Sequence, residues 1–198
     1  MGVGVKRGFT IVELLIVIVV IAILAAITIV AYNSIQQRAN NSARIANAQQ
    51  AIKEVTAYIN TYGKYPFTGV SCIGNGFAAG NTKCWGIDSA TPAGRSSVFN
   101  DTELVKIGSL PNNTTPPVQA ASWQALGPVY IYSSSYTVDG AANPLIVLYF
   151  LDGRDQECAG GRIVTSTATN TFTTVTSSPR NSGNSGSGTM CYVAMDGP

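Results

Sequence analysis

The feature that most constrains this chain is a run of 19 residues without a charge, residues 14–32. As a helix it would be about 28 Å long, close to the thickness of the hydrocarbon core of a bilayer. Lys6 and Arg7 are the only cationic residues that precede the run. Because positive residues tend to stay on the cytoplasmic side, we expect a cytoplasmic N-terminus and an extracytoplasmic remainder.

A secretory signal peptide is the simpler reading of such a segment, but two features argue against it. A signal peptide has a shorter apolar region that ends at a polar cleavage site, whereas this run continues into helix-forming sequence. In addition, Glu13 lies within the apolar region, where an ionised acid costs about 2.5 to 3.5 kcal/mol at the bilayer centre. Cleavage between Gly8 and Phe9 would create an ammonium about 6 Å along the helix axis from Glu13. The two charges could then neutralise each other within one chain or between neighbouring chains.

The composition excludes several classes of function. The formal net charge is +2, from 12 basic and 10 acidic residues, and it falls to zero without residues 1–8. A neutral chain lacks the basic field that nucleic-acid binding requires, so we expect no nucleic-acid partner. The absence of histidine removes the common catalytic triads and zinc sites. We therefore expect a protein that is not an enzyme and that holds no cofactor.

Four cysteines, an even number without any C-x-x-C pair, favour disulfides over metal ligation. Disulfides place the downstream part of the chain outside the cytoplasm. Three pairings are open to Cys72, Cys84, Cys158 and Cys191.

Two further patterns have simple explanations. Asp152, Asp155 and Glu157 could hold calcium, but they lack the spacing of an EF-hand, so an ordinary turn is favoured and no metal is predicted. The glycosylation sequons permit modification without predicting it. They begin at Asn40, Asn100, Asn112 and Asn113.

The sequence Lys6-Arg7-Gly8-Phe9-Thr10, followed by Glu13 and Leu14, resembles the class III signal of type IV pilins and pseudopilins. The resemblance covers about the first 35 residues and implies that a prepilin peptidase cuts after Gly8 and methylates the Phe9 amine. It implies that Glu13 pairs with the N-terminus of a neighbouring subunit during assembly. The implied partners are other copies of the chain in a helical filament, a platform membrane protein and an assembly ATPase.

The chain departs from that family at two positions. Many members have a proline where this chain has Val30 and a glycine where it has Ala22. A helix without the proline keeps its backbone hydrogen bond at that point. We therefore expect a continuous helix and not a locally melted one.

The helix is predicted to extend over residues 9–62. One apolar line with spacings of 3, 4, 3, 4 and 3 is expected to pack on a sheet. It consists of Ile45, Ala48, Ile52, Val55, Ile59 and Tyr62. Gly63 is a suitable C-cap and Pro66 prevents continuation.

The remaining residues, 63–198, are predicted to form an extracytoplasmic head. A short helix is expected at residues 101–107, and strands at 129–136, 145–151, 171–175 and 190–195. These elements indicate an α+β fold, in which an antiparallel sheet of three or four strands packs on the long helix. Locality and the family's C-terminal disulfide loop favour Cys72 with Cys84 and Cys158 with Cys191.

These patterns predict a structural subunit of a type IV pilus-like filament. It would have a leader at residues 1–8, a helix whose residues 9–32 first span the membrane, and a head displayed on a surface filament. One alternative is a pseudopilin or minor pilin of a secretion or DNA-uptake system. Another is a membrane-anchored extracellular binding domain that does not polymerise. The sequence leaves the filament's role in adhesion, motility, DNA uptake or secretion open.

Overall fold

The computed structural model describes most of the chain, in two compact units, Met1–Ala39 and Asn40–Pro198. The described residues are 8–76, 85–86, 101–120, 123–133, 135–142, 145–168, 171–176 and 188–195.

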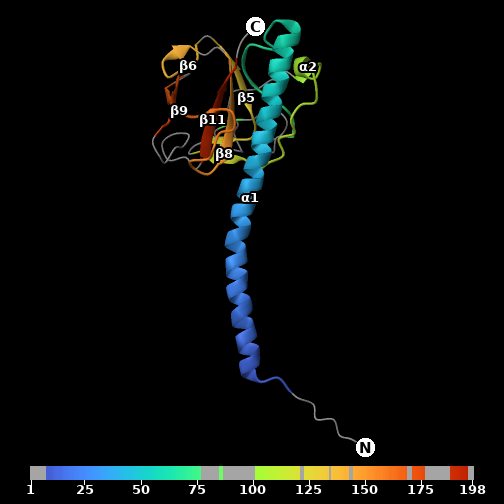
Figure 1. The fold of residues 1–198 in the computed structure, drawn as a ribbon, viewed down its shortest axis with the longest axis vertical. Coiled ribbons are helices and arrows are strands. Elements are labelled where there is room, and N and C mark those ends of the chain that lie inside the picture. Colours follow the sequence, from blue (N-terminus) through green and yellow to red (C-terminus); the bar gives the residue numbers. More distant parts are fainter. Residues whose placement is uncertain are drawn as a thin grey trace, which may run out of the picture. The chain divides into compact units, whose positions relative to one another are not determined.

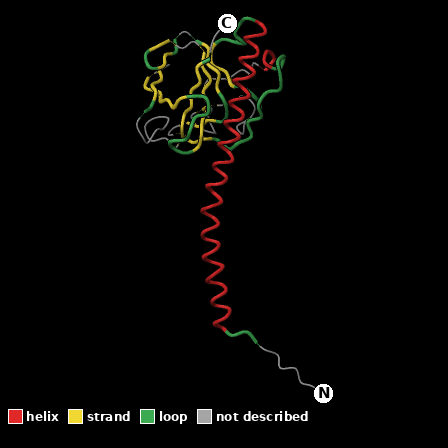
Figure 2. Tube along the Cα trace, in the orientation of Figure 1, coloured by secondary structure: helices red, strands yellow, loops and turns green. Residues whose placement is uncertain are grey.

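The helix α1, Ile11–Tyr62, begins in the first unit and ends in the second (Figures 1 and 2). Its helical backbone continues through Val30, which confirms the continuous helix expected from the absence of proline. It begins two residues later than the predicted start at Phe9. It ends at the predicted position, where Gly63 has the positive φ of 61° that a helix C-cap requires.

The second unit contains a mixed, mainly antiparallel sheet, which makes the fold α+β as predicted. Among the described residues its strand order is β1 (Gly69–Cys72), β5 (Val129–Tyr132), β8 (Leu145–Asp152), β11 (Gly188–Ala194), β9 (Arg162–Ala168), β10 (Thr171–Thr174), β6 (Thr137–Val138) and β7 (Ala141–Ala142). Among the named strands of this sheet, as far as the structure describes them, only β10 and β6 pair in parallel. A separate small sheet has the order β2 (Trp85–Gly86), β4 (Trp123–Ala125) and β3 (Val118–Ala120). The helix α2 occupies Asp101–Leu104.

The main sheet is wider than the three or four strands that the sequence predicted. The four predicted strands correspond to β5, β8, β10 and β11, although β5 ends at Tyr132 and not at residue 136. The strands β6 and β7 have two residues each, too few for a period-two pattern to be visible. The strand β9 consists mostly of small and hydroxylated residues, so it carries little hydrophobic signal. Pairing with β11 and β10 places these residues in the sheet.

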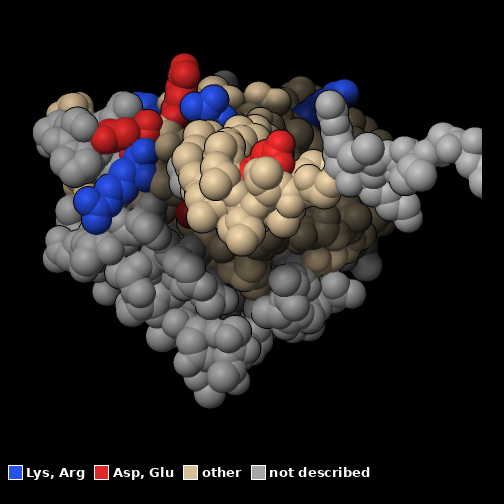
Figure 3. Space-filling view, turned by 90° about the horizontal axis from the view of Figure 1, so that it is seen from below, with Lys and Arg blue, Asp and Glu red and all other residues tan. Residues whose placement is uncertain are grey.

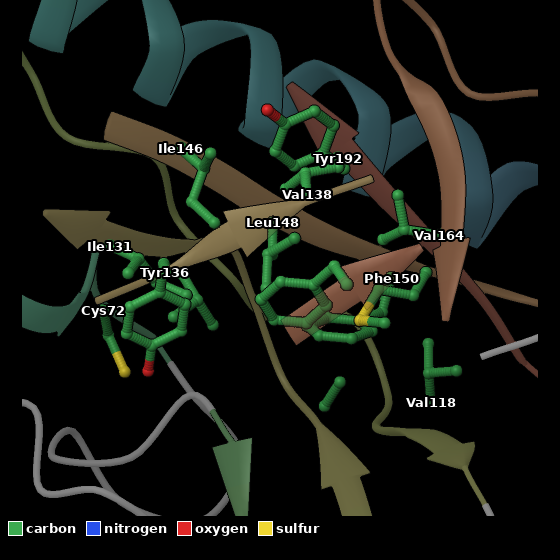
Figure 4. Packing of buried hydrophobic residues seen from close by; sticks show 14 of the residues in the cluster. Cys72, Val118, Ile131, Tyr136, Val138, Ile146, Leu148, Phe150, Val164 and Tyr192 are labelled. Carbon is green, nitrogen blue, oxygen red and sulfur yellow. The ribbon is translucent and has the colours of Figure 1, made fainter. Parts of the chain in front are cut away.

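Strand β8 is an interior strand of the main sheet, because it pairs with β5 on one side and β11 on the other. Every residue of this strand from Leu145 to Leu151 is buried. Ile146, Leu148 and Phe150 belong to one apolar cluster, together with Tyr192 of β11 (Figure 4). Leu145, Tyr149 and Leu151 belong to clusters that include residues of α1. The second half of α1 therefore covers one face of a sheet whose other face is also buried.

The buried line on α1 differs from the predicted one. Ile45 and Ile52 are only half-buried, and Tyr62 is exposed. The buried positions recur with spacings of 3, 4, 3, 4 and 3, in the order Asn41, Arg44, Ala48, Ala51, Val55 and Tyr58. The prediction was wrong at these positions because the helix approaches the sheet through small alanines, and because two polar residues there find backbone partners.

A disulfide joins Cys158 to Cys191, the pairing that the sequence favoured. Cys191 is completely buried in β11, and both cysteines pack with Tyr149 and Leu151 of β8. Cys72 is also disulfide-bonded, and Cys84, which the sequence favoured as its partner, lies outside the described residues.

Candidate processing and assembly segment

The start of α1 is fixed by a reciprocal capping box. The backbone N–H of Thr10 donates to Glu13 Oε2 at 2.7 Å, and the Thr10 hydroxyl donates to the same oxygen at 2.8 Å. In return, the Glu13 N–H donates to Thr10 Oγ1 at 3.2 Å. A Thr-x-x-Glu pattern satisfies the free amides of a helix N-terminus in this way. The Thr-x-x-Glu spacing is visible in the sequence, but the prediction for Glu13 rested on its charge alone and missed the capping box.

Because the helix begins at Ile11, Gly8 and Phe9 lie outside it. Both residues are exposed, and the Phe9 side chain retains 84% of its accessible surface. A Cβ atom added at Gly8 would meet nothing within 4 Å. The peptide bond between the two residues is therefore accessible, and Glu13 lies in the first turn of the helix that follows it.

The N-terminal part of α1 exposes its apolar side chains on all sides. An 18-residue window has a mean hydropathy of 3.4, and none of it is buried within the chain. Two polar side chains in and just beyond this region bond to the helix itself: Thr28 Oγ1 donates to Ala25 O and Ser34 Oγ to Ala31 O, both at 2.9 Å. Their hydroxyl donors are thus satisfied without water, as a lipid or protein environment requires.

Charged side chains contribute little to the described surface. Lys, Arg, Asp and Glu cover only small parts of the face in Figure 3, in keeping with a charged fraction of 11%. Among the described residues, no three Asp, Glu, Cys or His side chains lie together as a metal site would require. Asp152, one of the acids considered for calcium, instead bonds through its backbone to the side chain of Asn41.

Two of the four sequons, at Asn112 and Asn113, are neighbours in the chain but differ in exposure. Asn113 is only 1% exposed, and its amide donates to Ile73 O at 3.1 Å. Asn112 is exposed, whereas Asn40 lies within α1 and Asn100 is outside the described residues. The fold therefore makes Asn113 inaccessible to a modifying enzyme.

The model of the prokaryotic N-terminal methylation motif matches residues 5–29 of this chain. The N-terminal segment of this chain is similar to that of type IV pilins. This pilin-type segment is shared with the type IV major pilin protein PilE1 of Neisseria gonorrhoeae, which is 41% identical over 61 residues, 31% of this chain and 37% of that protein. A fimbrial protein of Neisseria meningitidis serogroup A is 38% identical over 66 residues, 33% of this chain and 39% of that protein.

The likeness to these pilins is confined to part of each protein. The matched residues span less than two fifths of the length of either relative. No solved structure matches the chain. The family resemblance seen in the sequence is confirmed for the pilin-type segment. These matches cover about a third of the chain.

Proposed function

We propose that the chain is a structural subunit of a type IV pilus-like filament. The observation that carries this proposal is the combination of the methylation motif at residues 5–29 with a helix whose apolar side chains are unburied. Such a surface can be buried in lipid before assembly and against the same surface of neighbouring copies afterwards. In this proposal the assembled helices form the filament core, and each head lies outside it.

Processing would precede assembly. A prepilin peptidase would cut the exposed bond after Gly8 and methylate the new amine of Phe9. Before cutting, Glu13 Oε2 accepts both described hydrogen bonds from Thr10. The ammonium created at Phe9 would give Glu13 a cationic partner on a neighbouring subunit, so that assembly compensates an acid in an apolar environment.

Mass spectrometry of the N-terminus tests the processing step. Expressed with a prepilin peptidase, the chain should begin at an N-methylated Phe9. Gly8→Val should remain uncut although nothing near Gly8 opposes the larger side chain, whereas the matched variant Gly4→Val should be cut. A mature chain that still begins at Met1, or one cut near Ala26, would contradict the proposal.

Electron microscopy of filaments tests the assembly step. Glu13→Gln keeps a side chain that can complete the capping box but removes the charge. We expect processing and membrane insertion to continue and filaments to be lost. Thr28→Val is the control, because it alters a polar residue in the same apolar region and should leave filaments intact. Normal filaments from Glu13→Gln would disprove the pairing role, and failure of every variant and of the parent to polymerise would favour a membrane-anchored binding domain.

A further inference from the structure

Three polar side chains of α1 donate to the backbone of one extended segment, residues 109–116, which we call the strap. The donors lie three residues apart on the helix and so form a row that is inclined to the helix axis. The acceptors follow in the reverse order, so the strap crosses α1 obliquely and antiparallel. The pairs are Gln50 Nε2 to Ser109 O, Asn47 Nδ2 to Asn112 O at 3.0 Å, and Arg44 Nη2 to Pro116 O at 2.6 Å.

The composition of the strap explains why side chains hold it. Pro111 and Pro116 have no N–H, so they cannot take part in a complete backbone ladder. Their carbonyl groups still need donors, and α1 supplies one of these through Arg44. On its other side the strap meets Asn75, whose N–H donates to Pro111 O at 3.0 Å. Every described hydrogen bond between the strap and α1 therefore uses a side chain of the helix as its donor.

The strap and the residue before it adjoin two buried charges. Glu54 is 8% exposed and lies against Gly108, where an added Cβ would be 2.7 and 2.8 Å from the two carboxylate oxygens. Glu54 Oε2 is buried and has no hydrogen-bond partner. A buried charged oxygen without a partner is costly, because it has lost its water and gained nothing in return.

The second charge lies at the other end of the strap. Arg44 is 8% exposed and bonds to two neutral oxygens, Asn41 Oδ1 at 2.8 Å and Pro116 O. Among the described residues, no carboxylate forms a salt bridge with it. A cavity of about 10 Å³ beside Arg44, lined also by Asn113 and Thr115, has room for roughly one water molecule. Both ends of the strap therefore cover charges that water would stabilise.

We propose that the strap is a releasable cover, which leaves α1 and admits water to Glu54 and Arg44 while the main sheet stays folded. Release breaks the side-chain hydrogen bonds from Gln50, Asn47 and Arg44 and the bonds that join the strap to residues 73–75. It also hydrates two charges, so it should cost less than unfolding of the sheet. Unfolding of the sheet would in addition break the backbone ladder of β8 and expose the apolar residues on both of its faces. The inference concerns the head alone and does not rest on filament assembly.

Hydrogen–deuterium exchange of the full chain in detergent micelles, with disulfides intact, measures release directly. Peptides from the strap should exchange faster than peptides from β8. Gln50→Ala should raise the exchange rate of the strap roughly five-fold, the effect of one neutral hydrogen bond. The matched variant Gln49→Ala, at an exposed neighbouring position of α1, should leave this rate unchanged.

Two further variants separate release from general unfolding. Glu54→Met removes the buried charge at similar length and should slow exchange of the strap, whereas the exposed Lys53→Met should not. Ile146→Val weakens the cluster on the far face of the sheet, so it should speed exchange in β8 and leave the strap unchanged. If Ile146→Val accelerates both peptides equally, or if Glu54→Met accelerates the strap, the proposal is wrong.

Discussion

Substitution of Asn41 by alanine should reveal how strongly α1 is fastened to the sheet. The Asn41 amide donates to Asp152 O at 2.8 Å, while Asn41 Oδ1 accepts from the Asp152 N–H and from Arg44 Nη1, both at 2.8 Å. Neutral hydrogen bonds contribute about 0.5 to 1.5 kcal/mol each, and those to charged groups about 1.5 to 3 kcal/mol. Asn41→Ala should therefore lower the free energy of unfolding by about 3 to 5 kcal/mol, because it also leaves buried donors without acceptors.

The assay is denaturant-induced unfolding of the full chain in detergent micelles, followed by aromatic fluorescence. Asn41→Asp keeps the acceptor for Arg44 but places a carboxylate against Asp152 O, so its loss should be intermediate. Gln49→Ala, an exposed substitution on the same helix, should change stability by less than about 0.5 kcal/mol. A loss below about 1 kcal/mol for Asn41→Ala would show that water replaces these bonds and that the Asn41 contacts do not fasten the helix.

Three further predictions follow from contacts in the head. Gly108→Ala should lower the free energy of unfolding by about 1 to 3 kcal/mol, because the added methyl group overpacks against Glu54. In a double-mutant cycle, the same substitution should lower it much less in a Glu54→Ala background. Additive losses would contradict the contact. Replacement of the Cys158–Cys191 pair by alanines should destabilise the head by about 3.5 to 4 kcal/mol by loop entropy for a sequence separation of 33, measured against the parent under oxidising conditions. Hydrogen bonds from Thr174, chiefly from its hydroxyl, lower the pKa of Asp139, so this acid stabilises the fold above its unfolded pKa and ceases to do so as the pH falls through the folded value. The stability difference between the parent and Asp139→Asn should therefore shrink on acidification, and a difference that stays constant with pH would exclude this role.

The N-terminal segment was predictable because its signals are local. The charges at Lys6 and Arg7, the uncharged run and Glu13 lie within one stretch of sequence, and helix continuity depends on neighbouring residues only. Even the capping box of Thr10 and Glu13 follows from a spacing of three. The long helix was therefore predicted to within two residues of its observed start.

The head was less predictable because distant pairing determines its strands. Runs of apolar and β-branched residues bounded by turn residues identified β8 and β11, which are buried on both faces or nearly so. Strand β9 is weakly hydrophobic and becomes a strand through its partners β10 and β11. The same reason explains the error on α1, where Asn41 and Arg44 are buried although polar, because backbone oxygens from Asp152 and Pro116 meet them.

The sequence by itself determined a pilin-type segment, a continuous apolar helix and an α+β head, since each depends on composition or on spacings of a few residues. Only the tertiary structure decided which face of α1 is buried, how wide the sheet is, and how the strap crosses the helix. Those features depend largely on backbone carbonyl and N–H groups, which nearly all residues carry alike. Folding alone determines which of these groups meet a given side chain.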